Sequence, residues 1–454
     1  MSEIGFILER LEARNDQPAL FWREKAYSGK FLARQVGDDI DFLARQGIKH
    51  GTVVLLRSDY SPRTVSLLLA LIELKTILAP LLPSTAAKIP ALIGLVNPAF
   101  QIEVSSEQVL AITQLEQSQS HPLISILQEA GKPGLILFTS GATGEPKGVV
   151  HDFARLLMKF RARRPAMRTL NFLLFDHWGG LNTLLHCLAN DGPVVLAESR
   201  TPGHICELLE RHQIELLPAS PTFLNMLLLS KAHDGRDLSA LRLITYGSEP
   251  MPASTLAALR TKFPNVELRQ TYGLIELGVL RAKSLSSESL WVKVGGEGYE
   301  VRVVDGILQI KAESAMLGYL NAPSPFTDDG FFVTGDRVEL NGEYIRFLGR
   351  ESELISVGGQ KVFPAEVEGI LLQCNLVEDA VVYGQRHPVT GKIVCADVQL
   401  RGTHDETEAR RVIKRFCVEH LEPFKVPVKI QFVDGGLHSD RLKRLRIGRE
   451  AVSR

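Results

Sequence analysis

Short apolar runs alternate with amphipathic segments through roughly the first 300 positions of this 454-residue chain. Thr52–Leu56 is typical of a strand, Arg63–Leu74 of a helix, and Thr76–Ala79 of a further strand that Pro80 should end. Strand and helix in alternation predict mostly parallel sheets covered by helices. The pattern continues in Val194–Ala197, Leu216–Ala219 and Leu243–Tyr246 as strands, and in His204–His212 and Ala253–Lys262 as helices.

The sequence pattern changes near residue 291, where short strands separated by Gly, Asp or Asn predict a small antiparallel barrel or meander. These strands are Trp291–Val294, Tyr299–Val304, Ile307–Ala312, Phe331–Val333, Arg337–Leu340 and Glu343–Phe347. We therefore expect a large first domain over residues 1–349, with a β-rich subdomain at about 291–349.

The remaining residues, 350–454, are numerous enough for a small second domain. Their pattern predicts an α+β unit. Its expected elements are the helices Pro364–Gln373 and Glu406–His420 and the strands Glu378–Gly384, Lys392–Gln399 and Lys429–Val433.

Composition narrows the class of protein. Lys and Arg number 52 and Asp and Glu also 52, a balance that argues against broad binding to nucleic acid or a membrane surface. The longest apolar stretch, Val65–Leu82, contains Glu73 and Lys75, which favours a core helix leading into a strand over a membrane span. Five cysteines without a CxxC pair predict buried free thiols rather than a zinc site. The first residues do not resemble a signal peptide, so we expect a cytoplasmic protein.

The run LILFTSGATGEPKGVVH, Leu135–His151, is the strongest functional signal. An apolar strand, Leu135–Phe138, leads into small and hydroxyl residues whose backbone N–H groups can surround an anion, and Lys147 adds positive charge. It is not a Walker loop, because Glu145-Pro146 separates the last loop glycine from the lysine. The composition favours a polyphosphate loop, although an ordinary turn would fit the composition as well.

Further strings carry groups suited to nucleotide chemistry. Gly247-Ser248-Glu249-Pro250 follows a predicted strand, and QTYGLIE, Gln270–Glu276, places a carboxylate after a Tyr-Gly turn. Asp336 lies in Thr334-Gly335-Asp336 and could accept two hydroxyl hydrogen bonds from a ribose diol. Each string taken alone would also fit a strand end or a turn.

Three more strings have both a functional and a structural interpretation. ISVGGQKVFPAEVE, Ile355–Glu368, pairs two glycines with a proline-initiated helix and could be only a loop entering that helix. The lysine Lys443 lies in a basic segment that could be a solvated surface. His177 and Trp178 could border a ligand pocket or pack in the core.

The strings occur in one order over Leu135–Arg446, and in that order they resemble the adenylate-forming (ANL) superfamily. This superfamily comprises acyl- and aryl-CoA synthetases, peptide-synthetase adenylation domains and luciferases. The resemblance implies an α/β fold. Its large N-terminal domain would have mostly parallel sheets covered by helices and a small β-barrel subdomain, and a small α+β C-terminal domain would be joined by a hinge at Ser352. The chain departs from the family patterns at Ala142, Ile275 and Leu442.

The resemblance implies an ATP site with Mg²⁺. Tyr272 would stack on adenine, Asp336 would bind the ribose, and Glu276 would hold the metal ion. Phosphate-loop contacts would come from Thr139, Ser140, Gly141, Thr143, Gly144 and Lys147. Other nucleotide contacts would come from Gly247, Ser248, Glu249, Gly273 and Arg350.

The implied catalytic residues are Lys443, Glu276 and Thr139, with Lys443 meeting the negative charge that develops at the α-phosphate. The acid pocket would be bordered by His177, Trp178, Gly273 and Leu274. Gly358 and Gly359 would serve the second half-reaction.

The implied activity is ATP-dependent conversion of a small carboxylic acid to acyl-AMP, with release of pyrophosphate, followed by transfer to the thiol of CoA. Transfer to the phosphopantetheine of an acyl carrier protein, or to an amine, stays open. A non-catalytic nucleotide-binding descendant also stays open, because of the departures at Ala142, Ile275 and Leu442. The acid and the oligomeric state are left undetermined.

Overall fold

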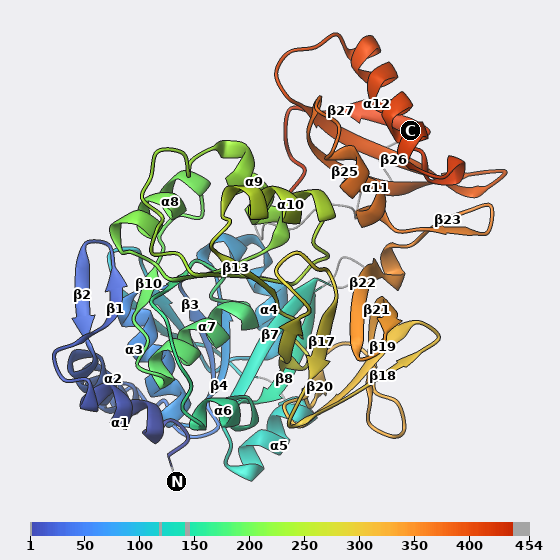
Figure 1. Cartoon of the computed structure of the whole chain (residues 1–454). Helices are drawn as coiled ribbons and strands as arrows, with labels where there is room; N and C mark the ends of the chain where they lie inside the picture. Colours follow the sequence, from blue (N-terminus) through green and yellow to red (C-terminus); the bar gives the residue numbers. More distant parts are fainter. Residues whose placement is uncertain (1, 118–119, 141–145, 439–454) are drawn as a thin grey trace.

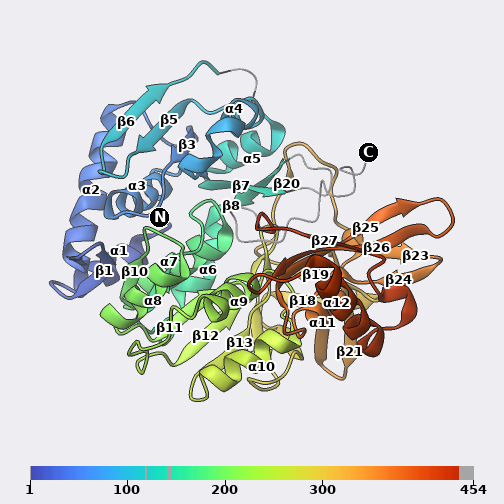
Figure 2. The same ribbon diagram turned by 90° about the horizontal axis from the view of Figure 1, so that it is seen from above.

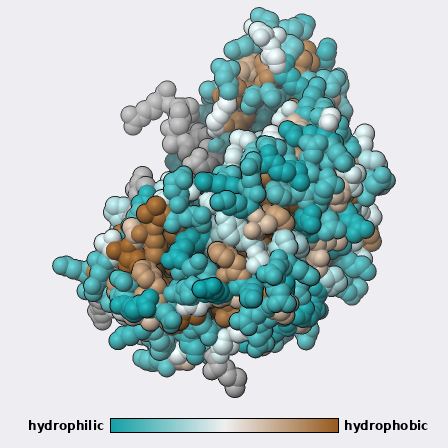
Figure 3. Space-filling model, turned by 90° about the vertical axis from the view of Figure 1, so that its left-hand side faces the viewer, coloured by the Kyte–Doolittle hydropathy of each residue, from teal (hydrophilic) through white to brown (hydrophobic). Residues whose placement is uncertain are grey.

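A computed structural model of the chain describes residues 2–117, 120–140 and 146–438. The described residues from Glu351 onward form a small unit at one end of the molecule, joined to the rest of the chain after β22 (Tyr344–Arg350) (Figure 1), and Figure 2 shows this unit from above. On the face drawn in Figure 3, hydrophilic residues predominate and hydrophobic residues are confined to separate patches.

The first sheet has the order β13-β12-β11-β9-β10-β1-β2 and is parallel except between β1 and β2. Its strands are β1 (Pro18–Trp22), β2 (Lys25–Ser28), β9 (Thr169–Asn171), β10 (Val194–Leu196), β11 (Leu216–Ala219), β12 (Leu243–Tyr246) and β13 (Glu267–Gln270). The helices of this part are α1 (Gly5–Ala13), α2 (Gly29–Arg45), α7 (Trp178–Ala189), α8 (Pro202–Arg211), α9 (Pro221–Ser230) and α10 (Ala253–Lys262).

The second sheet has the order β20-β8-β7-β4-β3-β5-β6, with a parallel centre and antiparallel edges. Its strands are β3 (Val53–Arg57), β4 (Ile77–Leu81), β5 (Phe100–Val104), β6 (Leu110–Gln114), β7 (Gly134–Ser140), β8 (Pro146–Asp152) and β20 (Gly318–Tyr319). Its helices are α3 (Pro62–Glu73), η1 (Pro83–Lys88), α4 (Ile89–Val96), α5 (Pro122–Ala130) and α6 (Phe153–Arg161).

Pro80 does not end its strand, so that prediction was wrong. β4 continues through Pro80 to Leu81, and Pro80 pairs in register with Leu56 of β3. The ladder from β4 to β7 extends only over Ile77 and Leu78, so no second ladder requires a backbone donor at Pro80.

The long apolar stretch forms α3 followed by β4, as predicted. Ser61 caps α3 by accepting a hydrogen bond from the Thr64 N–H, and Pro62 occupies the first helical turn. All residues of α3 from Val65 to Ile72 are buried, so this helix is largely apolar around its circumference because neighbouring elements enclose it. No helix within the described residues is both long enough and apolar enough to span a bilayer.

An antiparallel sheet follows, with the order β16-β17-β22-β21-β19-β18. Its strands are β16 (Arg281–Ser284), β17 (Val292–Gly295), β18 (Tyr299–Val304), β19 (Ile307–Ala312), β21 (Phe332–Asn341) and β22 (Tyr344–Arg350). The two strands expected at Phe331–Val333 and Arg337–Leu340 are the single strand β21, so their separation was wrong. Gly335, at φ +72°, and a register shift after Arg337 let the chain bend without leaving the sheet.

The C-terminal unit contains the sheet β24-β23-β26-β25, with β27 added in parallel to β26. Its elements are η2 (Glu351–Glu353), β23 (Ile355–Val357), β24 (Gln360–Val362), α11 (Pro364–Leu371), β25 (Val377–His387), β26 (Gly391–Leu400), α12 (Glu406–His420), η3 (Pro423–Lys425) and β27 (Lys429–Phe432). A separate hydrophobic core, which includes Val367, Val398 and Ile413, lies inside this unit. The α/β fold class is therefore confirmed, whereas the 349/350 domain boundary and a hinge at Ser352, within η2, stay predictions.

Candidate active site

The predicted phosphate loop joins two strands of an antiparallel hairpin. β7 extends beyond the expected Phe138 to Ser140, and Thr139 lies directly opposite Lys147 of β8. The intervening residues, which include the predicted contacts Gly141, Thr143 and Gly144 and the departure Ala142, lie outside the described residues. The hairpin thus places Thr139 and Lys147 side by side at the edge of that loop.

Asn321 holds the second strand of this hairpin. Its Oδ1 accepts a hydrogen bond from the Gly148 N–H over 3.1 Å, and its Nδ2 donates to the Pro146 carbonyl over 2.9 Å. No sequence motif pointed to Asn321, because it lies more than 170 positions along the chain from the strand it contacts. Only the tertiary fold reveals this contact.

Glu276 lies between the two short strands β14 (Gly273–Leu274) and β15 (Gly278–Val279). The two strands approach closely at Gly273, where a Cβ atom would lie 2.8 Å from the Gly278 carbonyl oxygen. The buried His151 Nε2 forms a 2.7 Å hydrogen bond with the Ile275 carbonyl, and burial lowers the pKa of His151 to about 4. A neutral imidazole that donates from Nε2 therefore supports the segment carrying Glu276.

Tyr319 connects Glu276 with the phosphate hairpin. Its hydroxyl donates to Glu276 Oε1 over 2.8 Å, and the Lys147 Nζ lies 5.2 Å from the centre of its ring. Burial, and then the nearby Glu276 charge, raise the pKa of the Tyr319 hydroxyl, which stays protonated as a donor. Tyr319 was also missed by the sequence analysis, which attached no function to Gly318-Tyr319.

Tyr272, Asp336 and Arg350 form a second group of contacts. The Tyr272 hydroxyl donates to Asp336 Oδ2 over 2.7 Å, and Arg350 Nε lies 3.3 Å from Asp336 Oδ1. Asp336 and Arg350 oppose each other across β21 and β22. Phe347 stacks on the Tyr272 ring at 4.6 Å between centroids and 16° between planes. The fold therefore brings together residues from two separately predicted strings.

Charge links this group to Glu276. Burial tends to lower the pKa of Arg350, but the charges of Asp336 and then Glu276 outweigh it and raise that pKa. Burial, and then the Asp336 charge, raise the pKa of Tyr272 well above its usual value, so its hydroxyl is a permanent donor. The two groups of contacts are thus electrostatically coupled through Arg350.

The Gly247–Glu249 turn has a special backbone geometry. Ser248 has φ +71°, and a Cβ on Gly247 would lie 2.6 Å from the Thr271 carbonyl oxygen. Glu249 Oε1 accepts a 2.7 Å hydrogen bond from the Thr222 N–H at the start of α9. At least one oxygen of Glu249 therefore caps a helix, and direct nucleotide contacts from this turn stay predictions.

The predicted acid-pocket residues lie at the start of α7 and beside it. His177 caps α7, because its Nδ1 accepts from the Gly179 N–H over 3.2 Å. Trp178 is 2% exposed, packs edge-on against Phe153, and its indole N–H has no hydrogen-bond partner among the described residues. This packing favours the core interpretation of Trp178, and a pocket role for His177, Trp178 and Leu274 stays a prediction.

The C-terminal predictions are only partly described. Gly358 and Gly359 turn the chain between β23 and β24 at φ +55° and +87°. The Gly358 N–H donates to the Thr390 carbonyl over 2.9 Å, which attaches this turn to the β25–β26 connection. Lys443 and the departure Leu442 lie outside the described residues.

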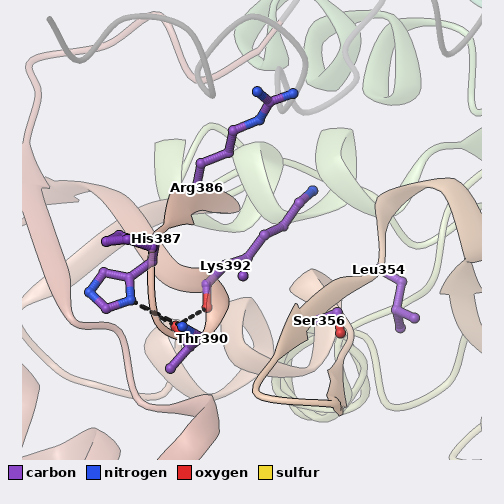
Figure 4. Close-up of a pocket in the computed structure, with 8 residues that line it drawn as sticks. Leu354, Ser356, Arg386, His387, Thr390 and Lys392 are labelled. Atoms are coloured by element: carbon purple, nitrogen blue, oxygen red, sulfur yellow. Dashed lines mark hydrogen bonds between the residues drawn. The ribbon is translucent and has the colours of Figure 1, made fainter.

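A hollow of about 620 Å³ lies beside this glycine turn (Figure 4). Its wall includes Ser356, Arg386, His387, Thr390 and Lys392. Arg386 and Lys392 oppose each other directly across β25 and β26, so two basic residues lie on this wall. We call these wall residues the basic pocket.

The residues fit a magnesium ion only together with a ligand. No group of three or more His, Cys, Asp or Glu side chains that could hold a metal occurs within the described ranges. Mg²⁺ commonly uses one or two carboxylates together with substrate phosphates and water, and the half-buried Glu276 beside Lys147 and Tyr319 suits that mode. The five cysteines, all within the described part of the chain, are buried free thiols, as predicted.

Comparisons with known proteins identify the family. Residues 8–319 match the family described as "AMP-binding enzyme", and residues 366–441 match "AMP-binding enzyme C-terminal domain". The chain is 27% identical over 369 residues to 4-coumarate:CoA ligase 1 of Petunia hybrida, covering 73% of this chain and 67% of that protein. It is 26% identical to the 2-succinylbenzoate–CoA ligase of Bacillus pumilus (strain SAFR-032), covering 96% and 95%.

Solved structures show the same fold. The o-succinylbenzoate CoA synthetase of Bacillus subtilis, in complex with its acyl-adenylate intermediate, superposes with a TM-score of 0.80 at 21% identity, covering 100% of this chain and 99% of that one. An anthranilate CoA ligase in complex with anthranoyl-AMP superposes with a TM-score of 0.79 at 20% identity, covering 98% and 95%. At these identities the likeness concerns the fold alone.

Proposed function

The chain belongs to the family of AMP-binding enzymes and is an AMP-forming acid–CoA ligase, and we propose that its ATP site is the cluster around Tyr272, Asp336, Glu276 and Tyr319. The observation that carries the proposal is a series of contacts in two groups that are coupled by charge. It runs from Tyr272 through Asp336 and Arg350 and, by charge, to Glu276, and then through Tyr319 to Lys147.

In the first half-reaction, a carboxylate oxygen of the acid attacks the α-phosphorus of ATP, and the bond to the bridging oxygen of the β-phosphate breaks. Pyrophosphate leaves and acyl-AMP forms. Asp336 binds the ribose hydroxyls, and Lys147 with Thr139 lines the mouth of the phosphate loop. Tyr272 offers adenine an aromatic ring that is already stacked on Phe347.

Two residues act on the negative charge of the phosphates in this step. Glu276 would hold Mg²⁺, which neutralises polyphosphate charge when it is bound. Lys443, on the C-terminal segment, would meet the negative charge that accumulates at the α-phosphate and the attacking carboxylate. Neutral His151 keeps the Glu276 segment in place without adding a charge of its own.

In the second half-reaction, the sulfur of CoA attacks the acyl carbon and AMP leaves. We propose that the C-terminal unit rotates near Ser352 between the two steps, because one small unit carries both Lys443 and the Gly358–Gly359 turn. The basic pocket borders this turn and has the charge to attract the phosphates of CoA.

The acid is a small carboxylic acid, and we propose an aromatic one. The curated relatives reported above are named for coumarate and succinylbenzoate, and one solved neighbour carries anthranoyl-AMP. An aromatic acid would pass into the region bordered by His177 and the β14–β15 hairpin. The buried indole N–H of Trp178 could then be satisfied by an acceptor oxygen or a water molecule.

Exchange of labelled pyrophosphate into ATP tests the proposal and identifies the acid together. We expect exchange that depends on one acid in a panel of benzoic, cinnamic and dicarboxylic acids. ATP binding without exchange on any acid would instead support the non-catalytic alternative. Offering CoA, a holo carrier protein and simple amines to the preformed acyl-AMP separates the acceptor classes.

A further inference from the structure

We infer that Tyr319 is a positioning residue that keeps Glu276 and Lys147 apart and available, so that the polyphosphate and its metal ion meet both charges. The inference rests on the proposed ATP site and adds a residue that neither the sequence motifs nor the comparisons assign. Tyr319 contacts both partners through different parts of one side chain, and the hydroxyl can be removed while the ring is retained.

The hydroxyl acts on Glu276. It donates to Oε1 over 2.8 Å, which orients the carboxylate and leaves the lone pairs of Oε2 and part of those of Oε1 for other ligands. The Glu276 main chain is anchored as well, because its carbonyl accepts from the Met316 N–H over 2.8 Å. The backbone and the side chain of Glu276 are therefore both restrained. This restraint suits a ligand of Mg²⁺, because this small ion requires near-ideal octahedral geometry.

The ring acts on Lys147. The ammonium lies 5.2 Å from the ring centre, within the range of a cation–π interaction. No salt bridge joins Lys147 to Glu276 among the described residues. The aromatic ring thus attracts the ammonium without neutralising it, which leaves the charge of Lys147 separate from that of Glu276.

The backbone keeps Tyr319 in register with the phosphate hairpin. In β20, Tyr319 pairs with Val149 and Gly318 with Val150, and the Leu320 N–H donates to the Gly148 carbonyl over 2.8 Å. Asn321, the residue after Leu320, accepts a hydrogen bond from the Gly148 N–H. The segment that carries Tyr319 therefore lies fixed beside the strand that carries Lys147.

Two substitutions separate the two contacts. Tyr319→Phe removes the hydroxyl from Glu276 and retains the ring beside Lys147, whereas Tyr319→Leu removes both. Tyr383→Phe is the matched control, because Tyr383 also donates its hydroxyl to a carboxylate, Asp397, in the C-terminal sheet. Thermal unfolding of each variant shows whether a loss of binding reflects a loss of fold.

Calorimetric titration of ATP, with Mg²⁺ and separately with EDTA, supplies a readout independent of turnover. For Tyr319→Phe we expect affinity for MgATP to fall about tenfold, while affinity for metal-free ATP changes less than about twofold, because only the carboxylate has lost its partner. For Tyr319→Leu we expect both affinities to fall. Tyr383→Phe should match the wild type.

Pyrophosphate exchange measured against Mg²⁺ concentration gives the second readout. Tyr319→Phe should need several-fold more Mg²⁺ for half-maximal exchange. Wild-type Mg²⁺ dependence in Tyr319→Phe, or an equal loss of affinity with Mg²⁺ and with EDTA, would overturn the inference. An inactive wild type that fails to exchange with any acid overturns the proposed function instead, so the two failures are distinguishable.

Discussion

The Tyr272 hydroxyl donates a 2.7 Å hydrogen bond to Asp336, which lies 64 residues further along the chain, and this bond joins the Tyr-Gly hairpin to the antiparallel sheet. Asp336 also faces Arg350, its cross-strand neighbour, over 3.3 Å. The carboxylate is thus held in one orientation, so if it binds the ribose as proposed, little side-chain entropy remains to be lost when ATP binds.

We predict that Asp336→Asn weakens ATP binding at least tenfold. The amide keeps the size of the carboxylate but lacks its charge, so it accepts hydroxyl hydrogen bonds less strongly and no longer pairs with Arg350. Calorimetric titration with ATP measures the loss. Asp329→Asn is the control, because Asp329 pairs with Arg302 on the exposed part of the same sheet region. Equal affinities in Asp336→Asn and the wild type would exclude Asp336 from the ribose site.

Asn321→Ala should loosen the phosphate hairpin. Two hydrogen bonds to β8 disappear, one part-buried and one exposed, and we expect a loss of about 1 kcal/mol in the free energy of unfolding. The KM for ATP should rise several-fold while the KM for the acid stays the same, since β8 carries Lys147. Urea unfolding and pyrophosphate exchange measure the two effects. Asn265→Ala, at an exposed loop position, should change neither quantity.

The contacts of Asn321 and Tyr319 could not be predicted from the sequence, whereas many elements of the fold could. The period of apolar residues predicted α10, β11, β12, β18, β19 and α12 with the observed bounds, because local burial determines these elements. The ordered motifs likewise indicated Tyr272, Asp336 and Arg350, which the fold brings into contact. Asn321 and Tyr319 have no local pattern, because their partners are placed only by the pairing of β20 with β8.

Backbone features were harder still to anticipate. Pro80 looks like a strand terminator, and it is tolerated because the neighbouring ladder has already ended at Leu78. Glu249 looks like a free carboxylate in a turn, whereas it caps α9 through Thr222. In both cases the deciding partner lies on another element, which a pattern along one segment does not reveal.

His151 should make stability depend on pH. Burial lowers its folded-state pKa to about 4, below the ordinary histidine value of 6.5, so between these values the unfolded chain binds the extra proton. Its contribution is therefore complete above pH 6.5 and is lost as the pH falls toward 4, by at most about 3 kcal/mol. His151→Gln keeps a donor for the Ile275 carbonyl without titrating. Urea unfolding from pH 7 to pH 4.5 should show a shallower fall for this variant, and parallel curves would contradict the assignment.

The basic pocket yields a prediction about the acceptor. Arg386→Gln removes one charge of the Arg386–Lys392 cross-strand pair, so the KM for CoA should rise about tenfold while adenylation, measured by pyrophosphate exchange, is unchanged. The KM for pantetheine, which lacks the nucleotide phosphates, should equal that of the wild type. Arg411→Gln, on the exposed face of α12 beside Glu408, is the matched control and should affect neither acceptor. A parallel rise in both KM values would show that Arg386 acts on the fold or on the pantetheine arm, because the two thiols share that arm and only CoA carries the phosphorylated nucleotide.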